Sequence, residues 1–512
     1  MTFSRRRFLE SSAAALAAGL AGCEGDATPA PGPWGAPSSA EAPLVLTPRA
    51  RPDAVFELFL FGGLCAWDTF YVVPEMGRPP PGEPDQGRLW WTYQEGPDSI
   101  PEVFARCGGG AEPLLQEYGR DAAGNTVHLG PWLLPLRRRP DLLRRMRVWV
   151  MRHDQVPHQG GNPVSLCGHR LGSPRLAGTA AHVQRFFQEQ TLRGRSLPFS
   201  TVLLPRNRDA EANHADAAAT VGLHERAARP LVVWLNDKAD LALELERRAA
   251  AGDSDAHALA EHYTEVFERR LRYSDRNWLQ RAPALEEYRA ARRALDDAGD
   301  LSRVLRPEAL ELVSGTSCGE SSDVDMTTTG IDLGLRFLRD PSLPSRYAIS
   351  VDGGFLPTTG GASYDTHSLH VVESARNVTH AMARLVERIN EPGEGDPDKF
   401  DLDRETVLIT TEFGRTPYRE GESGLDHWPG GYVQVALGGF VDEDRAGIVG
   451  AIGEDGFATD WVSPSEFRAA MLLAQGIWPF TPQSFAVGDV REGRDERESA
   501  AWLLEHLLGY GA

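Results

Sequence analysis

Five acidic and histidine residues stand close to apolar runs of this sequence, and together they could bind a divalent metal ion. They are Asp68, Asp365, His367, Glu412 and His427. Carboxylates combined with imidazoles suit zinc or manganese, whereas sites made mainly of carboxylates favour calcium or magnesium. Four of these residues could hold one ion, and Asp68 adds the carboxylate that a second ion would need. Two neighbouring ions can stabilise the attacking and leaving oxygens of phosphoryl or sulfuryl transfer.

The stretch at 410–428, TTEFGRTPYREGESGLDHW, indicates how such residues could be brought together. Glu412 follows an apolar run almost at once, and His427 returns at the end of a turn-rich loop. Arg415 lies on the same loop and could form a bidentate pair with an oxyanion. The alternative is that Arg415 simply pairs with an acidic neighbour such as Asp426.

Short apolar, β-branched or aromatic runs predict the strands that would position these residues. These runs lie at 55–61, 148–151, 231–235, 347–351, 406–410 and 432–437. Glu412 and Asp68 come after two of them, while Asp365 and His367 follow a third through a longer loop. Because ligands of open α/β sheets bind beyond the carboxyl ends of the strands, we expect the site at that edge.

Helical patterns alternate with the predicted strands. At 371–389 apolar residues recur every three or four positions, which predicts a helix with one buried face. The Arg- and Glu-rich stretch about 239–299 predicts a helical insertion, and 496–509 a closing helix. The body at 53–512 is therefore predicted to be one α/β domain, with a mostly parallel sheet between helices.

A less specific interpretation exists for part of this set. Asp365 and His367 directly precede a predicted helix, and acidic and hydroxyl residues often cap helix starts. Asp68 could equally be a turn residue of its loop. Acidic and histidine residues gathered after several strands favour a ligand cluster over these separate roles.

The amino terminus carries an export pattern. Residues 1–22 contain SRRRFL, typical of twin-arginine signals, followed by a short apolar run and LAG before Cys23. This order predicts a lipoprotein signal peptide, with the membrane contacted through lipidated Cys23 alone. The Pro-, Ala-, Gly- and Ser-rich stretch at 23–52 predicts a disordered tether. We therefore expect an exported protein, either periplasmic or an outer-membrane lipoprotein.

The charge and the cysteines limit the function further. The formal net charge of −20 argues against nucleic acid as a partner. Besides Cys23 there are four cysteines, at 65, 107, 167 and 318. Outside the cytoplasm they could form two disulfides in three connectivities, while folding before export would also allow free buried thiols.

Four motifs together resemble a bacterial secreted family called domain of unknown function 1501. They are FGGLCAWDTF at 61–70, YDTHS at 364–368, ITTEFGRTP at 409–417 and LDHW at 425–428. The resemblance covers about 55–480 and implies the alkaline phosphatase-like fold of the phosphatase and sulfatase superfamily. It implies one metal site at Asp365, His367 and His427, and a second at Asp68 and Glu412.

The same resemblance directs attention to His158. The superfamily's hydroxyl or thiol nucleophile is matched here by the segment 157–174, which places His158 near the nucleophile position. His158 could ligate the second ion, accept a phosphoryl group or orient water. Phe413 stands where the superfamily has a metal-binding histidine. Attack by metal-activated water is therefore expected in preference to covalent catalysis.

Two functional hypotheses follow. The first is an exported metal-dependent hydrolase of a small-molecule or glycan ester of phosphate or sulfate, with one or two ions at the strand ends. His158 and Arg415 would be its catalytic residues. The second is a non-catalytic cell-surface binding protein with a degenerate or structural metal site, favoured by the missing hydroxyl and by Phe413.

Overall fold

The structure is a computed structural model of the chain. It describes residues 46, 50–77, 98–170, 173, 177–188, 191–192, 195–196, 199–205, 229–251, 255–274, 288, 297–306, 318, 325–354, 364–420 and 423–511. The predicted signal peptide, Cys23 and nearly all of the predicted tether lie outside these residues. In the part of the chain that is described, no helix has both the length and the apolar character needed to cross a bilayer.

An eight-stranded sheet forms the centre of the molecule. Its strands, in spatial order, are β14 (Gly447–Val449), β4 (Met146–Met151), β13 (Tyr432–Leu437), β10 (Glu405–Thr410), β1 (Ala54–Leu60), β9 (Tyr347–Asp352), β7 (Thr201–Pro205) and β8 (Leu231–Val232). β13 runs antiparallel to both of its neighbours, and the other strands run in one direction. The predicted mixed α/β architecture with a mostly parallel sheet is confirmed.

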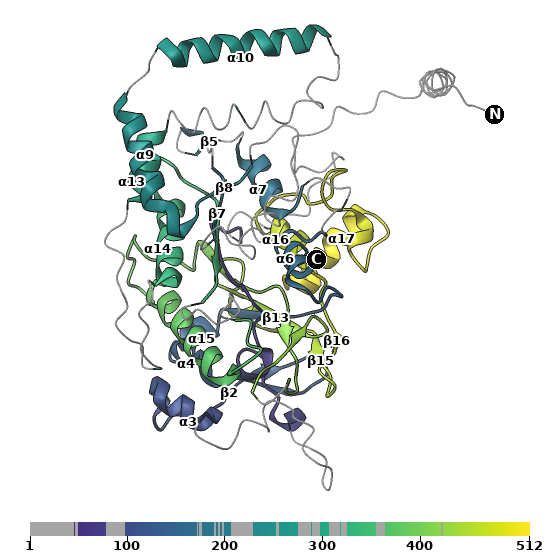
Figure 1. Ribbon diagram of the computed structural model, residues 1–512. Helices are drawn as coiled ribbons and strands as arrows, with labels where there is room; N and C mark the ends of the chain where they lie inside the picture. The colour runs from purple at the N-terminus through teal and green to yellow at the C-terminus, as the bar shows by residue number, and fades with distance from the viewer. Residues whose placement is uncertain are drawn as a thin grey trace, which may run out of the picture.

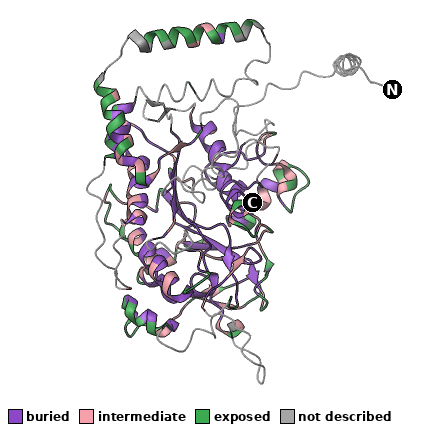
Figure 2. Cartoon of the chain, viewed as in Figure 1, coloured by how far each residue is buried: buried purple, intermediate pink, exposed green. Residues whose placement is uncertain are grey.

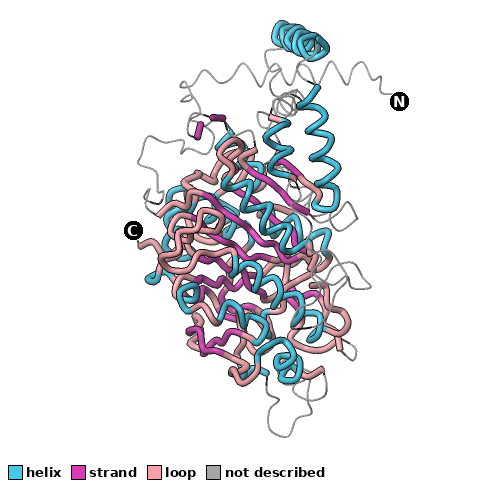
Figure 3. The backbone as a smooth tube through the Cα atoms, turned by 90° about the vertical axis from the view of Figure 1, so that its left-hand side faces the viewer, coloured by secondary structure: helices cyan, strands magenta, loops and turns pink. Residues whose placement is uncertain are grey.

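Helices cover both faces of this sheet, as Figure 1 shows. On one face lie α3 (Ile100–Phe104), α4 (Leu134–Arg137), α5 (Pro140–Leu143), α14 (Met326–Arg339) and α15 (His370–Glu387). On the other lie α6 (His158–Cys167), α7 (Thr179–Gln188), α16 (Pro464–Ala474) and α17 (Glu496–Trp502). In the turned view of Figure 3, the strands form a layer with helices in front of them.

The alternation of side chains along the central strands explains the two cores. In β1, Phe56, Leu58 and Leu60 pack toward α14 and α15, whereas Val55 and Phe59 pack toward α16. Successive side chains of a strand point to opposite faces, so a strand buried on both faces is mostly apolar. In β1 the exception is Glu57, which is fully buried. Fully burying such a side chain contributes roughly 1.5–3 kcal/mol to folding.

Two helices show how the sequence sets their boundaries. The predicted helix at 371–389 is observed as α15, and its apolar stripe, which includes Val371, Val378 and Leu385, is buried. At α16, Ser463 accepts a hydrogen bond from the Glu466 amide while the Glu466 side chain accepts one from Ser463. This reciprocal capping box fixes the start of that helix.

The stretch predicted to be helical, about 239–299, is mostly helical in its described parts. Three helices lie there or begin there: α9 (Lys238–Ala251), α10 (Asp255–Ser274) and α13 (Ala298–Leu305). α9 and α13 pack on β7, β8 and α14 around a smaller third core. Figure 1 shows α10 apart from the layered body, and Figure 2 shows it largely exposed.

Short paired strands complete the fold. They are β2 (Gln116–Arg120) with β3 (Thr126–Leu129), β5 (Thr191–Leu192) with β6 (Arg195–Ser196), β11 (Gly414–Arg415) with β12 (His427–Trp428), and β15 (Ala451–Ile452) with β16 (Ala458–Asp460). The β11–β12 pair matters most for the site, because Arg415 lies opposite His427 in its register.

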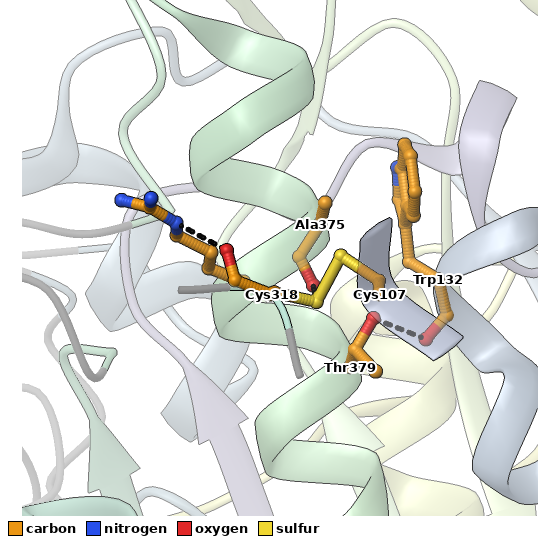
Figure 4. The surroundings of a disulfide bond; sticks show 6 residues. Cys107, Trp132, Cys318, Ala375 and Thr379 are labelled. Atoms are coloured by element: carbon orange, nitrogen blue, oxygen red, sulfur yellow. Dashed lines mark hydrogen bonds between the residues drawn. A yellow bond between two sulfur atoms is a disulfide. The ribbon is translucent and has the colours of Figure 1, made fainter. Parts of the chain in front are cut away.

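One disulfide joins distant parts of the chain. Cys107, after α3, is bonded to Cys318, which lies 211 residues further along. Figure 4 shows the bond beside Ala375 of α15, and Arg376 donates to the Cys318 carbonyl at 2.9 Å. Cys65 and Cys167 are free and buried. Of the alternatives that the sequence left open, the described residues thus show one disulfide and two buried thiols.

Candidate metal centre at the strand ends

Four chain segments bring the predicted residues to one edge of the sheet. Glu412 follows the carboxyl end of β10, and Asp365 lies in the segment between β9 and α15. His158 is the first residue of α6, which follows β4, and His427 begins β12. Their side chains meet at the side of the sheet where the parallel strands end, which is where ligands of open α/β sheets bind.

Glu412 is fully buried, yet one of its carboxylate oxygens lacks a partner. Its Oε1 accepts hydrogen bonds from the Gly62 amide at 2.8 Å and faces His158 Nδ1 at 2.8 Å. Its Oε2 is buried with no hydrogen-bond partner among the described residues. Leaving a buried carboxylate oxygen unsatisfied is costly, so a cation at this place would remove an energetic penalty.

His158 lies between two carboxylates. Its Nδ1 faces Glu412 and its Nε2 lies 3.2 Å from Asp365 Oδ2. Burial opposes protonation of this ring, but the hydrogen bonds to Asp365 and Glu412 outweigh it and raise the pKa to about 9. The protonated ring therefore contributes stability that is complete below about pH 6.5 and is lost as the pH rises through about 9.

Asp365 is the centre of the cluster. Its Oδ1 lies 3.0 Å from His427 Nε2 and 3.0 Å from His367 Nε2, and it also accepts from Arg415. Burial alone would raise its pKa, but His158, His427 and Arg415 together hold it well below the usual range. Asp365 is therefore an ionised carboxylate with several cationic or imidazole neighbours.

His367 forms the solvent-exposed side of the cluster, with 41% of its side chain accessible. Its Nε2 lies 3.1 Å from His427 Nε2, and its Nδ1 lies 2.9 Å from Glu420 Oε2. α15 begins at His370, and no side chain caps it through a hydrogen bond. The alternative interpretation, in which Asp365 and His367 cap this helix, is therefore wrong.

Arg415 is buried and contacts protein acceptors. Its guanidinium donates to the carbonyl oxygens of Gly62, Gly63 and Leu425 and to Asp365. It thus pairs with Asp365 and not with Asp426, and it ties the loop after β1 to the loop after β10. This arrangement makes it a positioning residue for Asp365 in the structure described.

Asp68 is the predicted ligand that the structure places elsewhere. Its Oδ2 accepts from Trp132 Nε1 at 2.8 Å and lies 2.9 Å from His370 Nε2. It groups with Cys65 and His370, not with Glu412 or Asp365. The sequence analysis predicted neither Cys65 nor His370 as a neighbour of Asp68. The motif YDTHSLH could have indicated His370, because it places a second histidine at the start of a predicted helix.

The donor set fits a divalent ion. The ligand atoms of His158, Asp365 and His427 all lie within 4.8 Å of one another, and those of His367, Asp426 and His427 form an adjoining group. Phe413 packs against the rings of His158 and His427, with centroids 5.2 and 4.5 Å away. The phenylalanine that replaces an expected histidine thus serves to position two candidate ligands.

His153 also reaches this edge but has a structural role. Its Nδ1 accepts from the Gln155 amide at 3.0 Å, so its Nε2 carries the proton and donates to the Glu412 carbonyl at 2.7 Å. Burial lowers its pKa despite this hydrogen bond. The neutral ring holds the backbone of Glu412 in place.

Two cavities among the described residues lie at the opposite end of the sheet. One of about 500 Å³ is lined by arginine and aspartate side chains, including Arg339 and Asp340. The other, of about 220 Å³, reaches Asp53 and Glu405, at the starts of β1 and β10. Neither contains a residue of the candidate metal centre.

Gly62 allows the loop after β1 to approach Asp365, and we expect Gly62→Ala to disrupt the centre. Its φ is +119°, and an added Cβ would lie 2.4 Å from the Asp365 amide nitrogen. The strain and the backbone clash should lower the free energy of unfolding by roughly 2–5 kcal/mol, measured by thermal denaturation.

Gly124→Ala provides the matched control for that substitution. Its φ is +87°, but an added Cβ meets no atom within 4 Å. Backbone strain alone should cost about 1 kcal/mol. Equal losses in the two variants would show that the close approach at Gly62 does not matter.

Comparison with known families gives one match. The model of the family described as Protein of unknown function (DUF1501) matches residues 150–481. No curated protein and no solved structure matches the chain. The matched range includes His158, Asp365, Glu412 and His427, whereas Cys65 and Asp68 lie before it.

Proposed function

Because the chain belongs to the family of unknown function DUF1501, whose name assigns no activity, we propose a function from the site itself. The chain would be an exported, metal-dependent hydrolase of phosphate or sulfate esters, built on an alkaline phosphatase-like fold. The observation that carries this proposal is the convergence of His158, Asp365 and His427, within 4.8 Å of one another, beside the unpartnered Oε2 of buried Glu412.

His158, Asp365 and His427 would hold the ion, with Glu412 at its buried side and His367 at its exposed side. A mixed set of imidazoles and carboxylates favours zinc or manganese over calcium or magnesium. When bound, such an ion supplies a Lewis acid for a phosphoryl or sulfuryl oxygen and lowers the pKa of water. A second group of potential ligands, His367, Asp426 and His427, adjoins the first and shares His427 with it.

The residues of the chain would prepare this site in two ways. Arg415 and Gly62 fix the position of Asp365, and Phe413 orients the rings of His158 and His427. With a pKa of about 9, His158 holds a proton at neutral pH that a bound cation would displace. Metal affinity should therefore increase as the pH rises toward 9.

Export is part of the proposal and has one structural support. Disulfides persist in oxidising compartments outside the cytoplasm, and the chain contains the Cys107–Cys318 bond. This agrees with the twin-arginine pattern and with the lipoprotein-like sequence before Cys23. The ester substrate would then be a periplasmic or surface-exposed small molecule or glycan.

A specific observation favours a second candidate, a non-catalytic binding protein with a structural metal site. Arg415, the predicted oxyanion partner, is occupied by backbone carbonyls and Asp365. Ser165, a hydroxyl residue in the segment 157–174 that also contains His158, is buried and donates to the Thr411 carbonyl at 2.6 Å. Neither group is presented as a free partner for a substrate.

Hydrolysis of generic phosphate and sulfate esters, measured with and without a chelator, tests the proposed function. We expect turnover in the metal-loaded chain, its loss after chelation, and its recovery when zinc or manganese is restored. Activity should be lost on chelation because the ion supplies the Lewis acid and lowers the pKa of the attacking water. Full metal occupancy without any ester hydrolysis would contradict the hydrolase proposal and favour the non-catalytic binding protein.

A further inference from the structure

We propose that Cys65, Asp68 and His370 form a second, fully buried site for a zinc-like divalent ion. Cys65 and Asp68 lie at the short turn after β1, and His370 is the first residue of α15. One ligand atom from each lies within 4.8 Å of the others. This site does not depend on hydrolysis, because it shares no ligand with the cluster at His158, Asp365 and His427.

Burial distinguishes this site from a surface cluster of acidic groups. The exposed fractions of Cys65, Asp68 and His370 are 2%, 0% and 1%. Asp68 Oδ1 is buried and has no hydrogen-bond partner among the described residues. An unsatisfied oxygen of a fully buried carboxylate requires compensation, which a cation between these side chains would supply.

Neighbouring residues already hold the outward-facing atoms of two ligands. Trp132 Nε1 donates to Asp68 Oδ2 at 2.8 Å, and Thr366 Oγ1 lies 2.6 Å from His370 Nδ1. Metal-binding histidines and carboxylates usually have such outer partners, which fix their orientation. Asp68 Oδ1 and the Cys65 sulfur could then face an ion. His370 Nε2 lies 2.9 Å from Asp68 Oδ2 and would exchange that contact for the ion.

The donor types indicate the class of ion. A thiolate, an imidazole and a carboxylate suit zinc, whereas calcium and magnesium prefer oxygen donors alone. Without a cation, a thiolate next to a buried carboxylate would be strongly disfavoured. A dication would compensate both negative charges at once.

The position of this site suggests its use. Thr366, which contacts His370, lies between Asp365 and His367 in the chain. An ion held by His370 would therefore fix the start of α15 and, through Thr366, the loop that presents the candidate metal centre. Because the ligands are buried, the ion would enter as the chain folds and would resist chelators that remove an exposed ion.

Cobalt substitution tests the site, because the thiolate gives bound cobalt a distinctive sulfur-to-metal charge-transfer band. The full chain would be produced in cells supplied with cobalt(II), purified folded, and treated with a chelator to strip the exposed centre. We expect about one cobalt per chain to remain, with the thiolate band in its absorption spectrum. A folded, chelator-treated chain without the band would overturn the proposal, whether or not it retains metal.

Three variants assign the band to its ligands. Cys65→Ser should abolish it, whereas Cys167→Ser should leave it intact, because Cys167 is the other free buried thiol and lies on the opposite face of the sheet. His427→Gln should keep the band while losing the chelatable ion and ester hydrolysis. A band that survives Cys65→Ser or disappears in Cys167→Ser would contradict the assignment, and the wild-type spectrum decides even if Cys65→Ser fails to fold.

Discussion

His427→Gln is expected to reduce metal-dependent ester hydrolysis by at least about 100-fold. Substituting a residue that only hydrogen-bonds to a metal ligand already lowers metal affinity or activity by about 10- to 100-fold, and loss of a ligand should cost at least as much. His427 Nε2 lies 3.0 Å from Asp365 Oδ1, and His427 belongs to both groups of potential ligands at the strand ends. Glutamine preserves polarity but removes the imidazole. The measurements are kcat/KM for a phosphate and a sulfate ester, and metal content by elemental mass spectrometry.

His262→Gln is the control for that substitution. His262 is an exposed histidine of α10, which lies apart from the sheet in Figure 1. It should retain full metal content and full activity, and circular dichroism should show both variants folded. If His427→Gln keeps its metal and its activity, the strand-end cluster does not bind the ion that supports hydrolysis.

The central sheet was predictable because its strands are buried on both faces. The predicted runs at 55–61, 148–151, 347–351, 406–410 and 432–437 are all observed as strands, within about two residues at their ends. The run at 231–235 forms a strand only at Leu231–Val232 before the chain turns into a 3₁₀ helix. Continuous apolar runs bounded by glycine or polar residues are a strong local signal.

α14 shows why other elements could not be predicted. The sequence TTTGID at its start has β-branched residues and glycine, which have low helix propensity. Its Gly334 is needed for contact, since an added Cβ would lie 2.4 Å from the Phe56 ring. The close packing of α14 on β1 therefore outweighs local propensity, and a single sequence does not reveal such a contact.

The candidate site was predictable in its residue types but not in its grouping. Asp365, His367, Glu412 and His427 meet as expected because each follows or precedes a predicted strand at the same edge. Asp68 also follows a strand, but the short turn at Ala66–Asp68 directs it toward Trp132 and His370. Strand order alone places a residue at an edge, whereas the path of the following turn decides which neighbours it meets.

Glu57→Gln is the substitution with the largest expected effect on stability, a loss of about 3–5 kcal/mol in the free energy of unfolding. Glu57 lies in the middle of β1 and pairs with Arg468 of α16, and both side chains are fully buried. Arg468 donates to the two carboxylate oxygens at 2.6 and 2.7 Å. Burial opposes ionisation of Glu57, but Arg468 outweighs it and lowers the pKa of the carboxyl. Denaturant unfolding measures the change.

The size of that loss reflects the charge that remains, because glutamine has nearly the same shape and leaves Arg468 buried without a counter-ion. Two comparisons separate this cause from a general sensitivity of the core. Glu57→Leu combined with Arg468→Met should recover most of the stability, since buried ion pairs can often be replaced by apolar residues at little cost.

Glu443→Gln breaks the exposed pair with Arg144, in which the side chains are 67% and 57% accessible, and should cost less than about 1 kcal/mol. If Glu57→Gln costs no more than Glu443→Gln, the arginine is not held as a buried cation, and the polar centre of β1 would need a different explanation.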